Sequence, residues 1–541
     1  MLADQAETVW TAPTTVQGLG FDGPNLWQVL QSGSTTEEAF ALASAKFNTI
    51  TTTGTGSWNL NGDGNYGGNF GFDPIIPNGP GSIAQFGDGT TNTLNNSAIN
   101  VTIDGAYTLG SLVFNPTNGA GYALVGDNLP GHGLVLDSGA GQGASIVVTS
   151  GSHSISSNLT LADAGGLTFN IAQGSSLALS GPLNESGGSR ALTVTGGGTL
   201  SLGSGNSFSG GTTVSGATLQ TTASGALGAG PLTLNSQPTA GSTVLIGGTE
   251  TISGLSGTIA QNSPNVLFIG PGANLNVRQA ANTTFQGTLV TSGAFNKSGD
   301  GTLEVVGAGI MDLGSSLTVS DGGTLRLRLS GGAMVSSGVV ARVSGSATLE
   351  LAGSVSNLSS AIGPGNRVAI VNNSTSASGL LVTGTNQQAG GIDGSGNIVV
   401  TDGASLAADH IVQTSLVIGG TLASPARVTI DASDDAGHPL DEPTGPMTGS
   451  PPTFALGGLA WRDGVFGASG SNSSALLTAA TTGTKPASMI DASAFSGSAL
   501  AGAMGGALSM GGHLVPEPAS WLLALLAILP LMMAIRVHGC R

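Results

Sequence analysis

The sequence predicts an all-β protein built as a parallel, right-handed β-helix (a β-solenoid), with an irregular N-terminal cap, a flexible C-terminal spacer and one C-terminal hydrophobic helix. Three observations predict this class: short runs that alternate apolar and polar residues, a recurring Gly-Thr-Leu word, and an unusual composition. Gly supplies 91 of the 541 residues and only 8% of residues are charged. Ordinary globular proteins carry about 25% charged residues. The surface must therefore be built mainly from Ser, Thr, Asn and Gly.

Short strand-like runs follow one another after residue 100. Examples are VTIDGAYTLGSLVF (101–114), SLTVSDGGTLRLRLSG (316–331) and ATLELAG (347–353). Alternation with a period of two, β-branched residues and flanking turn formers are typical of strands. No long segment of helical period interrupts the runs, so helices between parallel strands are not expected.

The word Gly-Thr-Leu, or its variant Ala-Thr-Leu, recurs through the middle of the chain. Its copies lie at 198–200, 217–219, 287–289, 301–303, 323–325, 347–349 and 420–422. Several successive copies are about 20–24 residues apart, a period typical of stacked repeats. We interpret each unit as one coil of a parallel β-helix, which is stable only when neighbouring coils continue its apolar core.

Changes in this pattern divide the chain into four segments. Residues 1–55 form a leader or small cap, and 56–432 form the β-solenoid repeat domain. Residues 433–514, rich in Gly, Pro, Ala and Ser, are expected to be a flexible spacer. Residues 515–541 form a sorting and membrane segment.

Charge and cysteine content exclude some classes of function. The net charge of −17 comes from 13 basic and 30 acidic residues, and so few cations cannot neutralise many phosphates. Nucleic-acid binding is therefore not expected. The one cysteine, Cys540, excludes a disulfide within this sequence and is interpreted as an incidental thiol.

Parallel β-helices also carry polysaccharide lyases and hydrolases, whose sites need clustered carboxylates beside a Lys, Arg or His. The dense acidic run lies near His438 and is interpreted as a solvated linker; it comprises Asp431, Asp434, Asp435, Asp441 and Glu442. Asp63 is interpreted as a turn residue and not a calcium ligand. The six histidines show no zinc-binding spacing. No catalytic residue, metal or cofactor is predicted.

The tail reads VPEPASWLLALLAILPLMMAIRVHGCR, and residues 521–535 are apolar without exception. A helix of this length reaches only about 22 Å, whereas the hydrocarbon core is about 30 Å thick. Its place after a flexible spacer, with Arg536 and Arg541 as flanking basic residues, nevertheless indicates a membrane helix with a cytoplasmic C-terminus.

The motif Val515, Pro516, Glu517 and Pro518, followed by an apolar stretch and basic residues, resembles the PEP-CTERM sorting signal. The resemblance implies an exosortase-type sorting enzyme as partner, which recognises the Pro-Glu-Pro triplet in bacteria that make exopolysaccharide. The basic end departs from the family pattern, because its two arginines are separated by VHGC.

The stretch GGGTLSLGSGNSFSGGTTVSGATLQ (196–220) is similar to the autotransporter-associated β-strand repeat, as is KSGDGTLEV (297–305). Asn206, Phe208, Gly210, Gly211 and the following TTV fill the positions of that repeat. The resemblance implies a passenger-like β-helix on a bacterial surface. No series of long alternating strands suited to a translocator barrel is present in the sequence.

Two functional hypotheses follow. The first is a non-enzymatic, exported surface or extracellular-matrix protein, structural or adhesin-like, that contacts exopolysaccharide and is anchored by residues 521–535. The second is a carbohydrate-active enzyme on the same scaffold. If the tail is not cleaved, the surface protein of the first hypothesis would stay tethered to the membrane.

Overall fold

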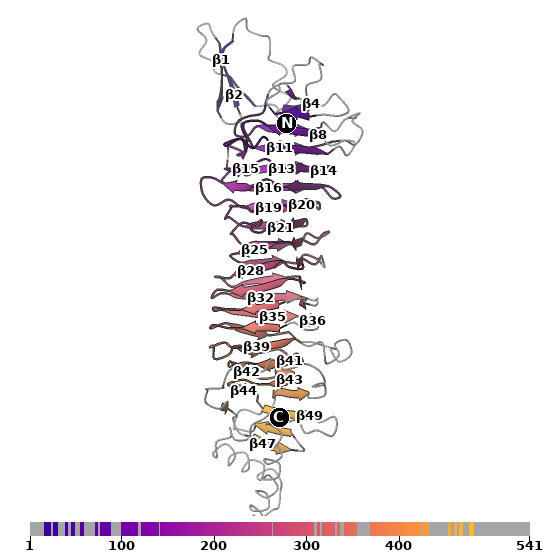
Figure 1. Ribbon diagram of the computed structural model, residues 1–541, viewed down its shortest axis with the longest axis vertical. Helices are drawn as coiled ribbons and strands as arrows, with labels where there is room; N and C mark the ends of the chain where they lie inside the picture. Colours follow the sequence, from indigo (N-terminus) through magenta and orange to yellow (C-terminus); the bar gives the residue numbers. More distant parts are fainter. Residues whose placement is uncertain are drawn as a thin grey trace, which may run out of the picture. The chain divides into compact units, whose positions relative to one another are not determined.

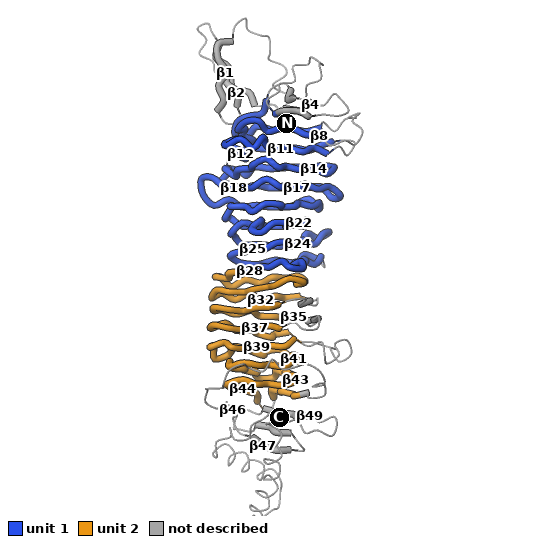
Figure 2. The backbone as a smooth tube through the Cα atoms, viewed as in Figure 1, with its two compact units in different colours: residues 1–276 blue, residues 277–541 orange. Residues whose placement is uncertain are grey.

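The computed structural model describes residue 58 and the ranges 76–87, 99–116, 121–139, 141–261, 263–307, 316–329, 340–353, 368–421 and 424–430. These residues fall into two compact units, 1–276 and 277–541 (Figure 2). Each unit is described by itself. Both are parallel β-solenoids, and no helix occurs in the described ranges. The predicted solenoid is confirmed there, whereas the predicted cap, spacer and hydrophobic helix lie outside them.

Unit 1 stacks its strands into three parallel sheets, visible as successive rungs in Figure 1. Sheet A1 comprises β7 Ile83–Phe86, β10 Ser111–Phe114, β13 Ala144–Val148, β16 Leu167–Ile171, β19 Leu192–Thr195, β21 Thr212–Ser215, β23 Leu232–Asn235 and β26 Leu255–Thr258. Sheet B1 comprises β8 Ile99–Ile103, β11 Tyr122–Gly126, β14 Ser152–Ile155, β17 Ser176–Leu179, β20 Thr199–Leu202, β22 Thr218–Thr221, β24 Thr243–Ile246 and β27 Val266–Ile269. Sheet C1 comprises β9 Ala106–Leu109, β12 Gly133–Leu136, β15 Leu159–Leu161 and β18 Leu183–Glu185.

Unit 2 repeats this plan, and most of its described strands belong to two sheets. Sheet A2 comprises β29 Thr283–Gln286, β32 Thr302–Gly307, β35 Thr324–Leu329, β38 Thr348–Leu351, β40 Leu380–Val382, β42 Asn397–Val400 and β44 Ser415–Ile418. Sheet B2 comprises β31 Ala294–Ser298, β34 Ser316–Val319, β37 Val340–Val343, β39 Ala369–Asn372, β41 Gln387–Asp393, β43 Ser405–Ile411 and β45 Ala426–Asp431. Three further strands lie in the described ranges: β25 Thr249–Ile252, β28 Asn274–Arg278 and β30 Thr288–Thr291.

Strict side-chain alternation produces the core. In β19 the side chains of Leu192 and Val194 are fully buried, whereas Thr193 and Thr195 between them face outward. The same alternation recurs in register on the next strands, so Val194 stacks on Val214, and Val214 on Leu234. Each apolar side chain buried in this way stabilises the fold by at most about 1.5–3 kcal/mol. Stacking makes the apolar column continuous from coil to coil.

Copies of the recurring word at 198–200, 217–219, 287–289, 301–303, 323–325 and 347–349 mark the beginning of a strand, whereas the copy at 420–422 does not, and the word does not mark a fixed place in the coil. The copies at 198–200 and 287–289 begin β20 and β30, whereas those at 301–303 and 323–325 begin β32 and β35 in sheet A2. Paired outward residues on neighbouring strands are separated along the chain by as few as 18 and as many as 34 residues, with values of 20, 23 and 24 between them. The predicted period therefore holds for many coils, but some coils are shorter and others are longer.

The repeat-like stretch around Asn206 forms a corner of unit 1. The Asn206 side chain accepts a hydrogen bond from the Leu183 backbone N–H at 2.9 Å and donates one to the Ala226 carbonyl at 2.6 Å. Phe208 is fully buried in the same corner. Gly211 has a φ of +95°, and a Cβ there would lie 2.7 Å from the Pro231 carbonyl oxygen. These residues therefore join one coil to the coils before and after it.

Candidate functional site

The outward side chains of sheet A1 form two columns of hydroxyl and amide groups, together called the hydroxyl face. The first column, one residue per strand in register, is Ser111, Ser145, Thr168, Thr193, Thr213, Thr233 and Ser256. The second column, two residues further along five of these strands, is Asn170, Thr195, Ser215, Asn235 and Thr258. Neighbouring strands are about 4.7–4.9 Å apart, so the groups repeat at that interval.

Hydrogen bonds to described residues leave the middle of the first column unengaged, whereas Thr195 and Ser215 of the second column bond to Phe169 and Gln237. The side chains of Ser111 and Ser145 are bonded at 2.9 Å, and those of Thr233 and Ser256 at 3.0 Å. No hydrogen bond to any described residue involves the hydroxyls of Thr168, Thr193 and Thr213, which are part-exposed. The seven strands from β10 to β26 also carry no ionisable side chain. This surface is polar, periodic and uncharged.

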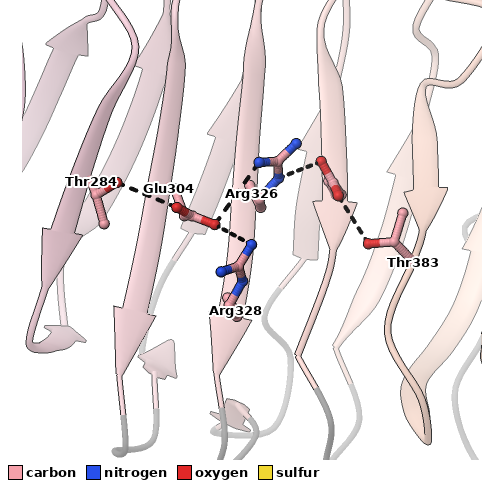
Figure 3. Close-up of polar contacts among 6 residues, drawn as sticks. Thr284, Glu304, Arg326, Arg328 and Thr383 are labelled. Atoms are coloured by element: carbon pink, nitrogen blue, oxygen red, sulfur yellow. Dashed lines mark hydrogen bonds and ion pairs between the residues drawn. The ribbon is translucent and has the colours of Figure 1, made fainter.

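Unit 2 carries a different outward row on sheet A2, the charged ladder (Figure 3). Its members are Thr284, Glu304, Arg326, Glu350 and Thr383, with Arg328 beside them. Glu304 stands in register with Arg326, and Arg326 with Glu350. Arg326 Nε donates to Glu350 Oε2 at 2.7 Å, while its Nη1 lies 3.9 Å from Glu304 Oε1. The guanidinium therefore lies between two carboxylates from neighbouring strands.

The two ends of the charged ladder are closed by hydroxyls. Thr284 Oγ1 donates to Glu304 Oε2 at 3.3 Å, and Thr383 Oγ1 donates to Glu350 Oε1 at 2.9 Å. Arg328 Nη2 lies 2.8 Å from Glu304 Oε1, an ion pair whose angles do not make a hydrogen bond. The Glu350 side chain is only 6% exposed, whereas that of Arg328 is 55% exposed. The ladder is thus electrically balanced and anchored most deeply at Glu350.

Replacing Arg326 by methionine is expected to lower the free energy of unfolding by about 1–2 kcal/mol, because it leaves the nearly buried Glu350 carboxylate without its cation. The matched change Arg328→Met removes an exposed pair and should cost less than about 0.5 kcal/mol. Denaturant unfolding of the two variants checks this difference, and equal losses would contradict the depth assigned to the ladder.

Three buried ionisable groups, Asp163, Glu250 and Lys297, are engaged by backbone groups at coil corners. The Asp163 carboxylate accepts from the backbone N–H groups of Ser138, Gly143 and Gly165. Burial raises the pKa of Asp163, but these bonds together with that of the Ser138 hydroxyl outweigh it, so the pKa lies below its usual value. Glu250 accepts from two buried backbone amides, and burial dominates there and raises its pKa. Both carboxylates tie one coil to another.

Lys297 also ties one coil to another, with a positively charged side chain. Its side chain is fully buried, and Nζ donates to the carbonyls of Gly299 at 2.6 Å and Gly322 at 3.1 Å, which belong to successive corners. Burial lowers the pKa of Lys297 to about 8, although Asp300 and Asp321 act in the opposite direction. The ammonium group therefore cross-links two coils.

Three of the six histidines lie in the described ranges. His132 pairs with Asp127 at 2.7 Å, and His410 lies 3.0 Å from Asp393. His153 is buried against Phe114, with ring centroids 4.4 Å apart. Its Nδ1 accepts from the Tyr122 backbone N–H, so Nε2 carries the proton and donates to the Ser150 carbonyl at 2.8 Å. Burial lowers the pKa of His153, against the opposing bond to Ser150.

Acidification is expected to destabilise unit 1 through His153. Because its pKa is lower in the folded chain, the unfolded chain binds more protons once the pH falls below about 6.5. The free energy of unfolding therefore decreases from that pH down to the folded pKa. His153→Phe keeps the ring stack but cannot titrate, so its unfolding free energy should change less between neutral pH and about pH 5. An unchanged pH slope in that variant would be inconsistent with this role.

Several residues singled out in the sequence lie outside the described ranges. They are the sorting motif Val515, Pro516, Glu517 and Pro518, the basic residues Arg536 and Arg541, and Asp63, Asp434, Asp435, His438, Asp441, Glu442 and Cys540. Within the described ranges, no group of three or more His, Cys, Asp or Glu side chains is arranged to hold a metal ion. The same ranges contain no helix with the length and hydropathy needed to cross a bilayer.

The candidate functional residues that the sequence did not single out are those of the hydroxyl face and the charged ladder. Glu304, Arg326 and Glu350 each follow directly after a Thr-Leu pair, so alignment of these copies is the signal that would have found the charged ladder. Comparison with known proteins gives no match to a family model, a curated protein or a solved structure. The hydroxyl face and the charged ladder therefore carry the functional argument.

Proposed function

We propose that this chain is a non-enzymatic, exported β-solenoid protein of the cell surface or extracellular matrix, structural or adhesin-like, which contacts exopolysaccharide. The observation that carries the proposal is how the ionisable groups are used. Asp163, Glu250 and Lys297 each form hydrogen bonds with backbone groups of coil corners. A catalytic acid or base must instead reach a substrate proton. The proposed solenoid is right-handed, because connections between parallel strands of one sheet are nearly always right-handed.

Sorting through the tail is the second part of the proposal. Pro516, Glu517 and Pro518 are recognised by an exosortase-type enzyme, while residues 521–535 hold the chain in the membrane before or after processing. The supporting features are the order of triplet, apolar stretch and basic residues in the sequence. This part rests on resemblance and on hydropathy.

Fractionation of the native host tests export directly. The protein should occur in the surface or extracellular fraction, and mass spectrometry of the mature chain should show whether residues 521–541 have been removed. A Pro516→Ala, Glu517→Ala double variant should accumulate unprocessed in the membrane. Recovery of the unaltered chain from the cytoplasm would refute export, and normal processing of the double variant would refute the role of the triplet.

The alternative is a carbohydrate-active enzyme, and one observation favours it. Glu304 and Glu350 are two carboxylates on one sheet face, carried by strands that are about 9–10 Å apart because one strand lies between them. Carboxyl groups of inverting glycosidases are about 6.5–9.5 Å apart. Arg326, however, occupies the space between them that a sugar ring would need. This is why the enzyme ranks second.

A turnover screen against uronate polymers and neutral glycans distinguishes the two functions. The display protein should release no product from any of them. Product formation that is abolished by both Glu304→Gln and Glu350→Gln, but retained in Arg328→Met, would establish the enzyme instead.

A further inference from the structure

We infer that the hydroxyl face of unit 1 is a binding surface for an uncharged linear polysaccharide. The inference deepens the proposed function, and rests on it only for the setting in which the protein meets glycan. The chemistry of this surface suits an uncharged partner. From β10 to β26 its outward groups are hydroxyls and amides with two valines, and the strands carry no ionisable residue. A polyanion such as a nucleic acid or a uronate polymer would find no cation there.

Three threonine hydroxyls in the middle of the first column are not bonded to any described residue. Thr168, Thr193 and Thr213 stand in register on successive strands, about 4.7–4.9 Å apart. That separation is too long for a hydrogen bond between neighbours, which needs about 2.7–2.8 Å between oxygens. Each hydroxyl can both donate and accept, and no described residue engages it. Three adjacent groups are therefore available to one extended partner.

The hydroxyls of the face repeat at a regular interval, as do those of a linear glycan. A linear glycan repeats its hydroxyls with every sugar, at an interval close to the spacing between strands. A glycan lying across the strands can therefore meet one rung after another. The second column, with Thr195, Ser215 and Asn235, widens the polar surface, and its side chains are held in place by bonds to Phe169, Gln237 and Thr258. The columns stand on rigid paired strands, so little ordering entropy is lost on binding. Weak contacts repeated along one chain then add up.

Sheet B1 of the same unit provides the internal comparison. Its strands also carry an outward column, with Ser152, Ser176, Thr199, Thr218 and Thr243 in register. The row beside that column is mixed, because Ala178, Leu245 and Phe268 interrupt it. Only one hydroxyl column runs there, from β14 to β24, and Val266 ends it on β27. Sheet B1 therefore offers matched threonines without the paired columns.

The test measures binding of the purified full chain to a soluble neutral β-glucan and, in parallel, to a uronate polymer. The unaltered chain should bind the neutral glycan with little dependence on salt. The double variant Thr193→Val, Thr213→Val removes two hydroxyls but keeps their shape and strand propensity, and should weaken binding roughly tenfold or more. The matched control Thr199→Val, Thr218→Val on sheet B1 should bind as the unaltered chain does. Thr193→Ser, Thr213→Ser, which keeps both hydroxyls, should retain most of the binding.

Each other outcome overturns the inference. Equal losses in the two valine variants would mean that the hydroxyl face is not the site, and salt-sensitive binding of the uronate polymer alone would mean a charged site. A protein particle of twice the mass of one chain in the absence of glycan, with the mass of one chain restored by Thr193→Val, Thr213→Val, would mean that a second copy occupies the face. Because binding is measured on purified chain, surface location without glycan binding would refute only this inference. Glycan binding by a chain that is never exported would refute only the proposed function.

Discussion

Replacing Phe208 by alanine is expected to lower the free energy of unfolding by about 3–5 kcal/mol, the usual cost of removing a buried aromatic ring. Phe208 is fully buried at a corner of unit 1. The backbone is tight around it, since a Cβ on Gly228 would clash with the Phe208 carbonyl oxygen. The corner cannot collapse readily into the space left by the ring, so the larger end of the range applies. Denaturant unfolding combined with amide exchange of β19, β21 and β23 measures the loss.

The control for this prediction is the neighbouring residue Ser207. Its exposed hydroxyl donates to the Asn184 side chain at 3.0 Å, a single bond at the surface worth less than about 1 kcal/mol. Ser207→Ala should therefore leave the amide protection of the three strands nearly unchanged. A Phe208→Ala variant as stable as Ser207→Ala would mean that the corner is not packed as described.

Placing a carboxylate inside unit 2 is expected to be still more damaging. Val305 is fully buried on β32 and stacks in register between Phe285 and Leu327. Val305→Asp puts an ionisable group where no described side chain can pair with it, and should cost more than about 4 kcal/mol. The variant should unfold in unit 2 at a much lower denaturant concentration, with loss of amide protection on β29, β32 and β35.

The next residue supplies a control of the same type. Val306 faces outward on the same strand, and its register partner is Arg328. Val306→Asp adds an exposed carboxylate near a cation, so its free energy of unfolding should change by less than about 0.5 kcal/mol. If the two aspartates were tolerated equally, the inward and outward assignment of β32 would be wrong.

The class of fold was predictable because alternation and corner glycines are local properties. Strands such as LTVT around Val194 and TLEVVG around Val305 show their inward and outward residues directly in the sequence. Strand starts were also predictable, since Gly-Thr-Leu begins β20, β32 and β35 alike. The sorting motif and the apolar tail lie outside the described residues and stay predictions.

The register between coils was not predictable, and the candidate surfaces depend on it. Ser111 meets Ser145 across 34 residues, whereas Thr284 meets Glu304 across 20. A single assumed period would have placed one of these pairs wrongly. The residues that hold the corners were hidden for a related reason. The Asp163 carboxylate binds amides at both Gly143 and Gly165, and no spacing rule joins three such positions.

The central claim is that successive coils stack in register and so present a column of outward hydroxyls on one face. A pair of engineered cysteines tests it, in a Cys540→Ser background that removes the one native thiol. Thr193→Cys with Thr213→Cys places two Cα atoms on adjacent strands about 4.8 Å apart, within the range of about 4.4–6.8 Å that a disulfide spans. Mild oxidation should link this pair almost completely within one chain. Thr193→Cys with Thr218→Cys, which lie on different sheets, should stay reduced. Equal linking of both pairs, or of neither, would contradict the stacked solenoid and the surface built on it.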